Sequence, residues 1–298
     1  MSGCGDSEPE KKLPTQDDVR TYYEKNTKRF LRFGGGEEIG AIHRKVWAKG
    51  VKTKTDALLY VNRRILEILH RFSPSHKKEK RVLDVGCGVG GTALWIARHA
   101  NISTFGISNS QRQIDIARRR ASSYRLNERC TFFRMDYHRI HTLGLFDAAV
   151  AVESFAHAKD PARFFRSVSN ALVEGGICIV FDDFLTDCGK AGGENNMSTS
   201  KAFQWIDRVR KGWHLTSLIG VKEAVKCAEA AGLLLKKNED LTPFLRQFPP
   251  VFLEPMKLLS LLPLHFPFYE NLSGGTALQH SIKRGWVQYR SLTWIKRK

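Results

Sequence analysis

Short apolar runs alternate with longer amphipathic segments through the middle of the chain, between residues 76 and 185. Such runs predict buried strands, and apolar residues at helical spacing predict helices. Strands are expected at 82–85, 103–107, 130–134, 146–152 and 177–181, and helices at 92–99, 111–122 and 161–172, the last ended by Gly175 and Gly176. This alternation predicts an α/β fold, with a doubly wound, mainly parallel sheet between layers of helices.

The segments outside this core follow other patterns. Residues 1–15 are polar and predict a disordered leader, whereas 16–75 predict a helical N-terminal cap with helices at 17–30 and 55–72. Residues 220–298 resume the core pattern, with a helix at 221–231 and strands at 233–236 and 285–296. The pairing direction of the last strand is left open by the pattern.

Two insertions, 186–219 and 241–283, interrupt the alternation. Ligands of open α/β sheets bind beyond the carboxyl ends of the strands, so both insertions are predicted to be lids over that edge. The second contains an apolar, proline-rich stretch at 249–268. A cap packed on the core is the favoured interpretation of this stretch, and peripheral contact with a membrane is the alternative.

Composition adds a strong positive charge to this picture. The 298 residues include 48 Lys and Arg against 30 Asp and Glu, which gives a formal net charge of +18. Such a surface favours anionic partners: a carboxylate or diphosphate substrate, acidic lipid headgroups or nucleic acid. The basic residues are dispersed in short runs, which fits a solvated surface equally well.

The cysteines and the N-terminus bear on compartment and metal content. Six cysteines show neither a CxxC pair nor zinc-ligand spacing, so we expect free thiols, a reducing compartment and no metal. The N-terminus lacks an apolar signal region, and no run of about 18 apolar residues is present. A cytoplasmic protein is therefore expected, with an undetermined oligomeric state.

The most specific motif is RVLDVGCGVGG at residues 81–91. A buried strand runs into a glycine turn and then a helix, whose first N–H groups are available to an anionic ligand group. Asp84 precedes the first glycine by two residues, and this pattern resembles the first motif of class I S-adenosylmethionine-dependent methyltransferases. The resemblance implies a Rossmann-like fold and S-adenosylmethionine as cofactor, with S-adenosylhomocysteine as product. The loop residues expected at the cofactor are Asp84, Gly86, Cys87, Gly88 and Gly90.

A second segment narrows the resemblance. At the end of the second strand GISNSQRQIDIA places Ser108 where dinucleotide enzymes carry an acid for the ribose. The pattern resembles sterol, tocopherol and sugar methyltransferases, and that resemblance implies that Gln113 reaches the ribose. Met135 and Asp136 end the third strand, where the resemblance implies contact between Asp136 and the adenine amine.

Three side chains at strand ends are candidates for catalysis. Glu153 ends the fourth strand, His157 follows it in AVESFAHAKD, and Asp183 ends the fifth strand. By the resemblance to a rebeccamycin-sugar methyltransferase, His157 and Asp183 would form a base pair that takes the proton of an acceptor hydroxyl. Alternatively, the negative charge of Glu153, which is also expected at the cofactor, would stabilise the positive charge of a sulfonium or a carbocation.

The acceptor is predicted to be a small, largely apolar molecule, anionic or lipid-like, methylated at carbon or oxygen. YYEKNT and AIHRKVW resemble the cap of the same methyltransferases. The residues expected to contact the acceptor are Tyr22, Tyr23, His43, Trp47 and Trp213. An RNA methyltransferase is a lesser alternative. Enzymes that methylate base amines carry an (Asn/Asp)-Pro-Pro-aromatic turn after the fourth strand, where this chain has ESFA. A catalytically silent S-adenosylmethionine-binding protein is the third alternative.

Overall fold

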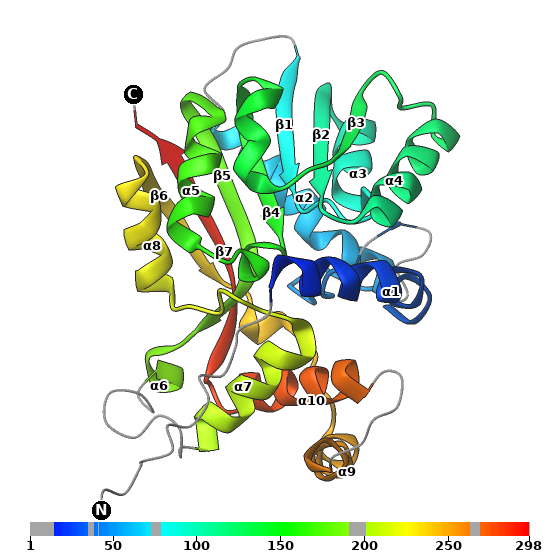
Figure 1. Ribbon diagram of the computed structural model, residues 1–298, viewed down its shortest axis with the longest axis vertical. Helices are drawn as coiled ribbons and strands as arrows, with labels where there is room; N and C mark the ends of the chain where they lie inside the picture. Colours follow the sequence, from blue (N-terminus) through cyan, green and yellow to red (C-terminus); the bar gives the residue numbers. More distant parts are fainter. Residues whose placement is uncertain are drawn as a thin grey trace, which may run out of the picture.

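The computed structural model describes residues 15–34, 39–40, 42–72, 79–190, 201–262 and 269–297. A seven-stranded sheet forms its centre, in the order β3-β2-β1-β4-β5-β7-β6 (Figure 1). The strands are β1 Lys80–Val85, β2 Ile102–Ser108, β3 Cys130–Arg134, β4 Phe146–Val152, β5 Leu172–Leu185, β6 Leu233–Asp240 and β7 Val287–Lys296. The predicted α/β class and the Rossmann-like arrangement of strands are confirmed.

The first five strands are parallel, and β7 runs antiparallel between β5 and β6. This settles the direction that the sequence pattern left open. The chain order of the strands reverses at β1, which pairs with β2 on one side and β4 on the other. In open sheets the crevice at such a reversal is where ligands bind.

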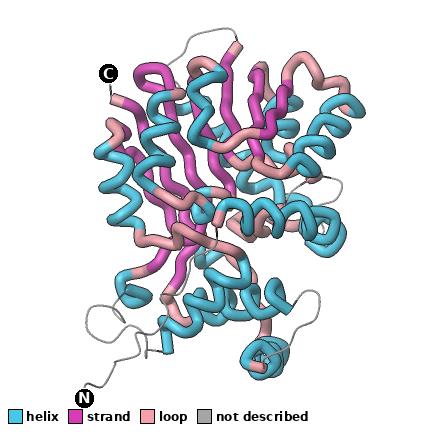
Figure 2. Tube along the Cα trace, in the orientation of Figure 1, coloured by secondary structure: helices cyan, strands magenta, loops and turns pink. Residues whose placement is uncertain are grey.

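Helices cover both faces of the sheet (Figures 1 and 2). On one face α5 Pro161–Asn170 and α8 Val221–Ala230 pack on side chains such as Leu83 and Val85. On the other face α2 Lys54–Phe72 packs on residues that include Val82. Adjacent residues of β1 thus bury opposite faces, as a fully buried strand requires. Two further helices follow β1 and β2 in turn: α3 Gly91–His99 and α4 Gln111–Ser123.

The boundary between α5 and β5 differs from the prediction. The helix ends at Asn170, Leu172 already belongs to β5, and Gly175 and Gly176 lie inside that strand. Phe146 pairs with Leu172 but Ala148 pairs with Ile177, so β5 carries extra residues in a bulge. Gly175 adopts φ +70° there, a conformation that glycine adopts readily. The glycines therefore mark a bulge and not the end of a helix.

Helix α1 of the N-terminal cap and the helices of the two insertions lie beyond the carboxyl ends of the strands (Figure 1), whereas α2, expected in the same cap, packs on a face of the sheet. The cap begins with α1 Gln16–Gly34, and all of the expected leader except Thr15 lies outside the described residues. The first insertion contains α6 Asp187–Lys190 and α7 Lys201–Trp213. The second contains the short η3 Thr242–Phe244, then α9 Pro250–Leu261 and α10 Tyr269–Lys283.

Two glycines set the contact between the insertions. A Cβ built on Gly212 of α7 would lie 2.4 Å from Cα of Gly274 in α10, and one built on Gly274 would lie 2.7 Å from Cα of Gly212. Helix backbones approach this closely only where side chains are absent. The two insertions thus pack as one unit, with α9 on the outer side of α10 (Figure 2).

Candidate functional site

A cavity lies at the carboxyl ends of β1, β2 and β4, under α1 and the segment 39–48. It holds about 1020 Å³ of space free of protein atoms, which includes its opening to solvent. The lining is polar around the glycine loop. Apolar side chains that include Val19 of α1, Val152 and Ala158 complete the lining. The position matches the crevice expected at the reversal of strand order.

The glycines of the loop between β1 and α3 are needed for different structural reasons. Main-chain N–H groups of Gly86 and Cys87 both donate to the carbonyl of Ile107, at 3.0 and 2.9 Å, which fixes the turn against β2. A Cβ on Gly86 would strike Ser154 at 2.4 Å, and one on Gly90 would strike Phe132 at 2.8 Å. These two glycines are therefore required for packing against protein; Gly86 also lines the cavity, whereas Gly90 is not among the lining residues.

Gly88 lines the cavity and has open space where a side chain would begin. It adopts φ +54°, and a Cβ built on it would meet only Cδ1 of Ile42, 4.0 Å away. Gly88 and Cys87 both line the cavity. Any side chain at residue 88 would project into the space that a ligand needs.

Asp84 presents an unpaired oxygen in the cavity wall. The residue is 3% exposed, and Oδ2 has no hydrogen-bond partner among the described residues. Burial raises the pKa of this carboxyl to about 7, while the main-chain N–H of Ala93 opposes the shift. A buried carboxylate with an open lone pair is suited to an ammonium or hydroxyl group of a ligand.

Ser108 and Gln113 form a buried hydrogen-bonded pair at the next strand end. The Ser108 hydroxyl donates to Oε1 of Gln113 at 2.7 Å, and both residues line the cavity. Ser110 caps α4 by accepting the Gln113 main-chain N–H at 3.2 Å and donates to Glu24 of α1 at 2.9 Å. The Gln113 carbonyl is thus held by protein, which leaves its amide group for a ligand.

Met135 and Asp136 reach the same cavity from the end of β3. The Met135 N–H donates to the Ser108 carbonyl at 2.9 Å, and Asp136 caps the short helix η1 Tyr137–Leu143. Its Oδ1 accepts the main-chain N–H of His138 at 2.9 Å. Asp136 therefore combines the capping of η1 with a place in the wall.

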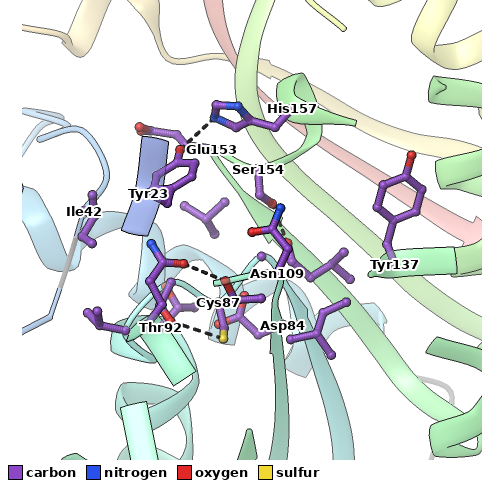
Figure 3. Close-up of a pocket in the computed structure, with 18 of the residues that line it drawn as sticks. Tyr23, Ile42, Asp84, Cys87, Thr92, Asn109, Tyr137, Glu153, Ser154 and His157 are labelled. Atoms are coloured by element: carbon purple, nitrogen blue, oxygen red, sulfur yellow. Dashed lines mark hydrogen bonds between the residues drawn. The ribbon is translucent and has the colours of Figure 1, made fainter. Parts of the chain in front are cut away.

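Glu153 follows β4 in a strained conformation. Its φ is +49°, which is unfavourable for a residue with a side chain, and its N–H donates to the Phe181 carbonyl at 2.7 Å. Oε1 accepts the main-chain N–H of Arg44 at 2.8 Å. Strain of this kind is often found at functional sites. Figure 3 shows Glu153 beside Tyr23 and His157 at the upper rim of the cavity.

His157, in the short helix η2 Phe155–His157, has hydrogen bonds at both ring nitrogens. Nδ1 lies 3.2 Å from the carbonyl oxygen of His214, and Nε2 lies 2.8 Å from the hydroxyl of Tyr23 (Figure 3). A carbonyl only accepts, so Nδ1 carries the proton and Nε2 accepts from Tyr23. Burial lowers the pKa of His157 to about 4, and the ring is neutral at neutral pH.

The predicted pair of His157 with Asp183 is not formed. Asp183 is bound instead by Arg44, whose guanidinium donates through Nη1 to Oδ1 at 2.6 Å and through Nη2 to Oδ2. Arg44 also lies over the ring of Tyr289, with 5.0 Å between Cζ and the centroid. A bidentate arginine outcompetes a neutral imidazole for a buried carboxylate.

Arg44 is the functional candidate that sequence reasoning missed. It connects the segment 39–48 to both Glu153 and Asp183. Its neighbour His43 was noticed, but nothing in AIHRKVW distinguishes the arginine from the other basic residues of a chain with 48 Lys and Arg. Only the fold brings residue 44 against residues 153 and 183.

Of the five residues expected to contact an acceptor, Tyr23 and His43 line the cavity. Tyr22, Trp47 and Trp213 do not, because each packs elsewhere. The Tyr22 hydroxyl donates to Asn271 of α10 at 2.5 Å, Arg246 covers the Trp47 ring at 3.3 Å, and Trp213 packs against Gly274 and Gly275.

His43 offers an unused lone pair to the cavity. Its Nδ1 lies 3.2 Å from the carbonyl of Arg44 and so carries the proton, whereas buried Nε2 has no hydrogen-bond partner among the described residues. Burial lowers the pKa of His43, against an opposing effect of Glu153. The imidazole is therefore a neutral base on a residue that lines the cavity.

No helix in the described ranges is long and apolar enough to cross a membrane. No group of three or more His, Cys, Asp or Glu side chains in the same ranges could hold a metal ion.

The sequence comparison agrees with the fold and the cavity. Residues 58–235 match the family model described as a methyltransferase domain, and this chain belongs to that family. Its members are S-adenosylmethionine-dependent enzymes, as the glycine motif predicted.

Three similar proteins illustrate the range of the group. The sterol 24-C-methyltransferase of Aspergillus fumigatus is 30% identical over 55% of this chain, but the match spans only 42% of that enzyme. The methyltransferase GfsG of Streptomyces halstedii is 30% identical over 62% of this chain and 70% of its own length. The solved [4+2]-cyclase SpnF superimposes with a TM-score of 0.71, at 25% identity, and covers 96% of this chain and 97% of its own.

Proposed function

We propose that this protein transfers a methyl group from S-adenosylmethionine to a small, largely apolar acceptor at carbon or oxygen. The observation that carries the proposal is the buried, unpaired Oδ2 of Asp84 beside the bare main chain of Gly88. When bound, the cofactor supplies an electrophilic methyl group on sulfur. The protein then has to hold both reactants in line and accept a proton.

The residues of the cavity fit this cofactor. Asp84 would accept hydrogen bonds from its amino-acid end, because it lines the cavity and its buried Oδ2 has no partner among the described residues. The amide of Gln113, with its carbonyl already held by Ser108, would donate to the ribose. Met135, Asp136 and Tyr137 would surround the base.

The opposite end of the cavity is proposed to receive the acceptor. Val19, Val152 and Ala158 give it an apolar wall, and Tyr23 and Glu153 add polar groups at its rim. An apolar molecule with one polar or reactive group would bury its body there. Methylation of sterols, named for the fungal relative, is the same class of reaction.

A proton must leave the acceptor in either version of the reaction. Attack by oxygen releases a hydroxyl proton, and attack by an alkene carbon ends with loss of a proton from the resulting cation. We assign this proton to Nε2 of His43, which is neutral, buried and unpartnered. His157 has its Nε2 occupied by Tyr23, and Asp183 is held by Arg44, so both are proposed to position the site.

Mass spectrometry with methyl-deuterated S-adenosylmethionine tests this function. The chain is incubated with separate sterol, prenyl diphosphate, polyketide lactone, phenol and RNA acceptors, and products are examined by NMR for the new bond. We expect one labelled methyl group on an apolar acceptor. Labelled RNA would overturn the acceptor class. A rearranged acceptor of unchanged mass would overturn methyl transfer in favour of a cyclase activity, such as that named for SpnF.

A further inference from the structure

Helix α9 lies at the outer end of the molecule (Figure 1), and it carries an exposed apolar stripe. Val251, Phe252 and Leu258 are 71%, 63% and 70% exposed. Phe248, Leu261 and Leu262 extend the stripe at 45%, 50% and 50% exposure. Phe248 is three and four residues from Val251 and Phe252, Leu258 is three and four residues from Leu261 and Leu262, and Val251 and Leu258 are seven apart, which places them on one side of the helix and its flanks. Soluble proteins rarely leave several large apolar side chains exposed together on one helix without a partner.

The inner side of α9 already has its partner. Leu253 and Ser260, seven residues apart, are buried at 0% and 3% exposure where the helix packs on α10. The outer stripe is therefore not the side by which α9 packs on the rest of the protein. It does not close the site either, because none of the described residues of α9 lines the cavity.

The helices of the two insertions carry an excess of positive charge. Residues 201–213, 241–262 and 269–286, which build α7, α9 and α10, contain eight Lys and Arg against three Asp and Glu. Lys257 pairs with Glu254 at 2.9 Å, and Lys283 of α10 also acts on the pKa of Glu254, which places it beside α9. An apolar stripe flanked by cations matches the boundary between the headgroups and the acyl chains of an anionic membrane.

We propose that the α9 stripe docks this protein on membranes that contain anionic lipids. Phe252, Val251 and Leu258 would enter the boundary layer, and Lys283 and its basic neighbours would meet the headgroups. A second copy of this chain is a poorer partner, since two units with the same excess of positive charge would face each other across the contact. Docking does not depend on the methyl transfer proposed above.

The position of α9 places the site near the docked surface. Asn271 of α10 accepts the hydroxyl of Tyr22 at 2.5 Å, and the next residue of α1, Tyr23, lines the cavity. Helix α1 thus lies next to the carboxyl ends of the strands, α10 lies beyond α1, and α9 with its stripe lies beyond α10 (Figure 1). An apolar acceptor could be taken from the membrane through this end of the molecule.

Vesicle flotation with the full chain tests the proposal. The probes are phosphatidylcholine vesicles with and without phosphatidylserine, and the variant is Phe252→Glu with Leu258→Glu. The matched control is Leu145→Glu, an apolar residue 52% exposed just before β4. We expect flotation with the anionic vesicles only. The double variant should lower vesicle affinity at least about tenfold, because two apolar insertions are replaced by charges, and the control should not.

Circular dichroism and the midpoint of thermal unfolding confirm that the variants are folded, since all three residues are largely exposed. Equal flotation of the wild type and the double variant, or equal binding to neutral vesicles, would overturn the proposal. Concentration-dependent dimers that the double variant abolishes, without vesicle binding by the wild type, would assign the stripe to self-association instead.

Discussion

Single residues around the cavity carry protonation states that simple experiments can detect. Asp84 is the clearest, with a pKa raised by burial to about 7 and one oxygen unpartnered. Neutral His157, with a pKa of about 4, and neutral His43 lie on the other side of the cavity. The cavity is thus lined by one carboxyl group that titrates near neutrality, Asp84, and by two imidazoles that remain uncharged, His43 and His157.

The affinity for S-adenosylhomocysteine should fall as pH drops below about 7. Its ammonium group needs ionised Asp84, so a proton must first leave, which costs roughly tenfold in affinity per pH unit. Calorimetry between pH 8 and pH 5 measures this, and Asp84→Asn should bind weakly with a flat profile. A wild-type affinity independent of pH would remove Asp84 from the cofactor site.

Substitution of the two histidines should separate their roles. His43→Gln should lower kcat about 10²–10⁴-fold, the usual contribution of a positioned base, with S-adenosylhomocysteine affinity unchanged. His157→Gln should have a smaller effect on kcat, because Nε2 already accepts from Tyr23. Steady-state kinetics on the identified acceptor decide between them. A severe loss in His157→Gln with an active His43→Gln would restore His157 as the base.

Some residues of this site could be predicted from the sequence, and others could not. Asp84 and Gly88 of the first motif and Gln113 of the second line the cavity because strand, turn and helix fix each motif locally. The pair of His157 with Asp183 failed because a third group, Arg44, comes from a segment far away in the chain. Local patterns cannot show which long-range competitor reaches a buried carboxylate.

At the scale of elements, the segment 39–48 is fastened to the sheet by Arg44 and Asp183. Arg44→Met should lower the free energy of unfolding by about 3 kcal/mol, because it leaves a buried carboxylate unpaired. Urea denaturation measures the change, and Arg63→Met, which removes an exposed partner of Asp56, should cost under about 1 kcal/mol. Equal losses in the two variants would show that Arg44 does not fasten this segment.

The crossing of α7 and α10 offers a second test with a control one residue away. Gly274→Ala should destabilise the protein by about 1–3 kcal/mol, because its Cβ would overlap Cα of Gly212. Gly275→Ala should be neutral or slightly stabilising, since its Cβ would lie 3.7 Å from Trp213 in ordinary contact. Thermal unfolding compares the two variants. Identical midpoints would mean that the helices do not cross closely at Gly274.

Element prediction worked best where apolar runs were uninterrupted. The strands at 130–134 and 146–152 agree with β3 and β4 to the residue. The helix expected to end at Leu172 stopped at Asn170 instead, because a glycine pair was interpreted as a terminator while it formed a bulge. A bulge depends on pairing with a neighbouring strand, so the single segment did not reveal it.

At the scale of the whole molecule, three regions have different structural roles. The sheet and its helices present the glycine loop, α1 with the segment 39–48 covers the cavity, and α7 with α9 and α10 forms a basic, partly apolar end (Figure 1). The net charge of +18 was visible in the sequence. The sequence did not show that an exposed apolar stripe lies in the same part of the molecule as basic residues, because the exposure of the stripe depends on how the two insertions pack.

The central claim is that the cavity at Asp84 and Gly88 holds S-adenosylmethionine. Calorimetric titration of S-adenosylhomocysteine into the wild type and the variants Gly88→Leu and Gly232→Leu tests it most directly. Both glycines have positive φ, but a side chain at Gly88 enters the cavity, whereas a Cβ at Gly232 meets nothing within 4 Å. We predict one-to-one binding by the wild type and Gly232→Leu and none by folded Gly88→Leu. No binding by the wild type, or unchanged binding by Gly88→Leu, would contradict the account.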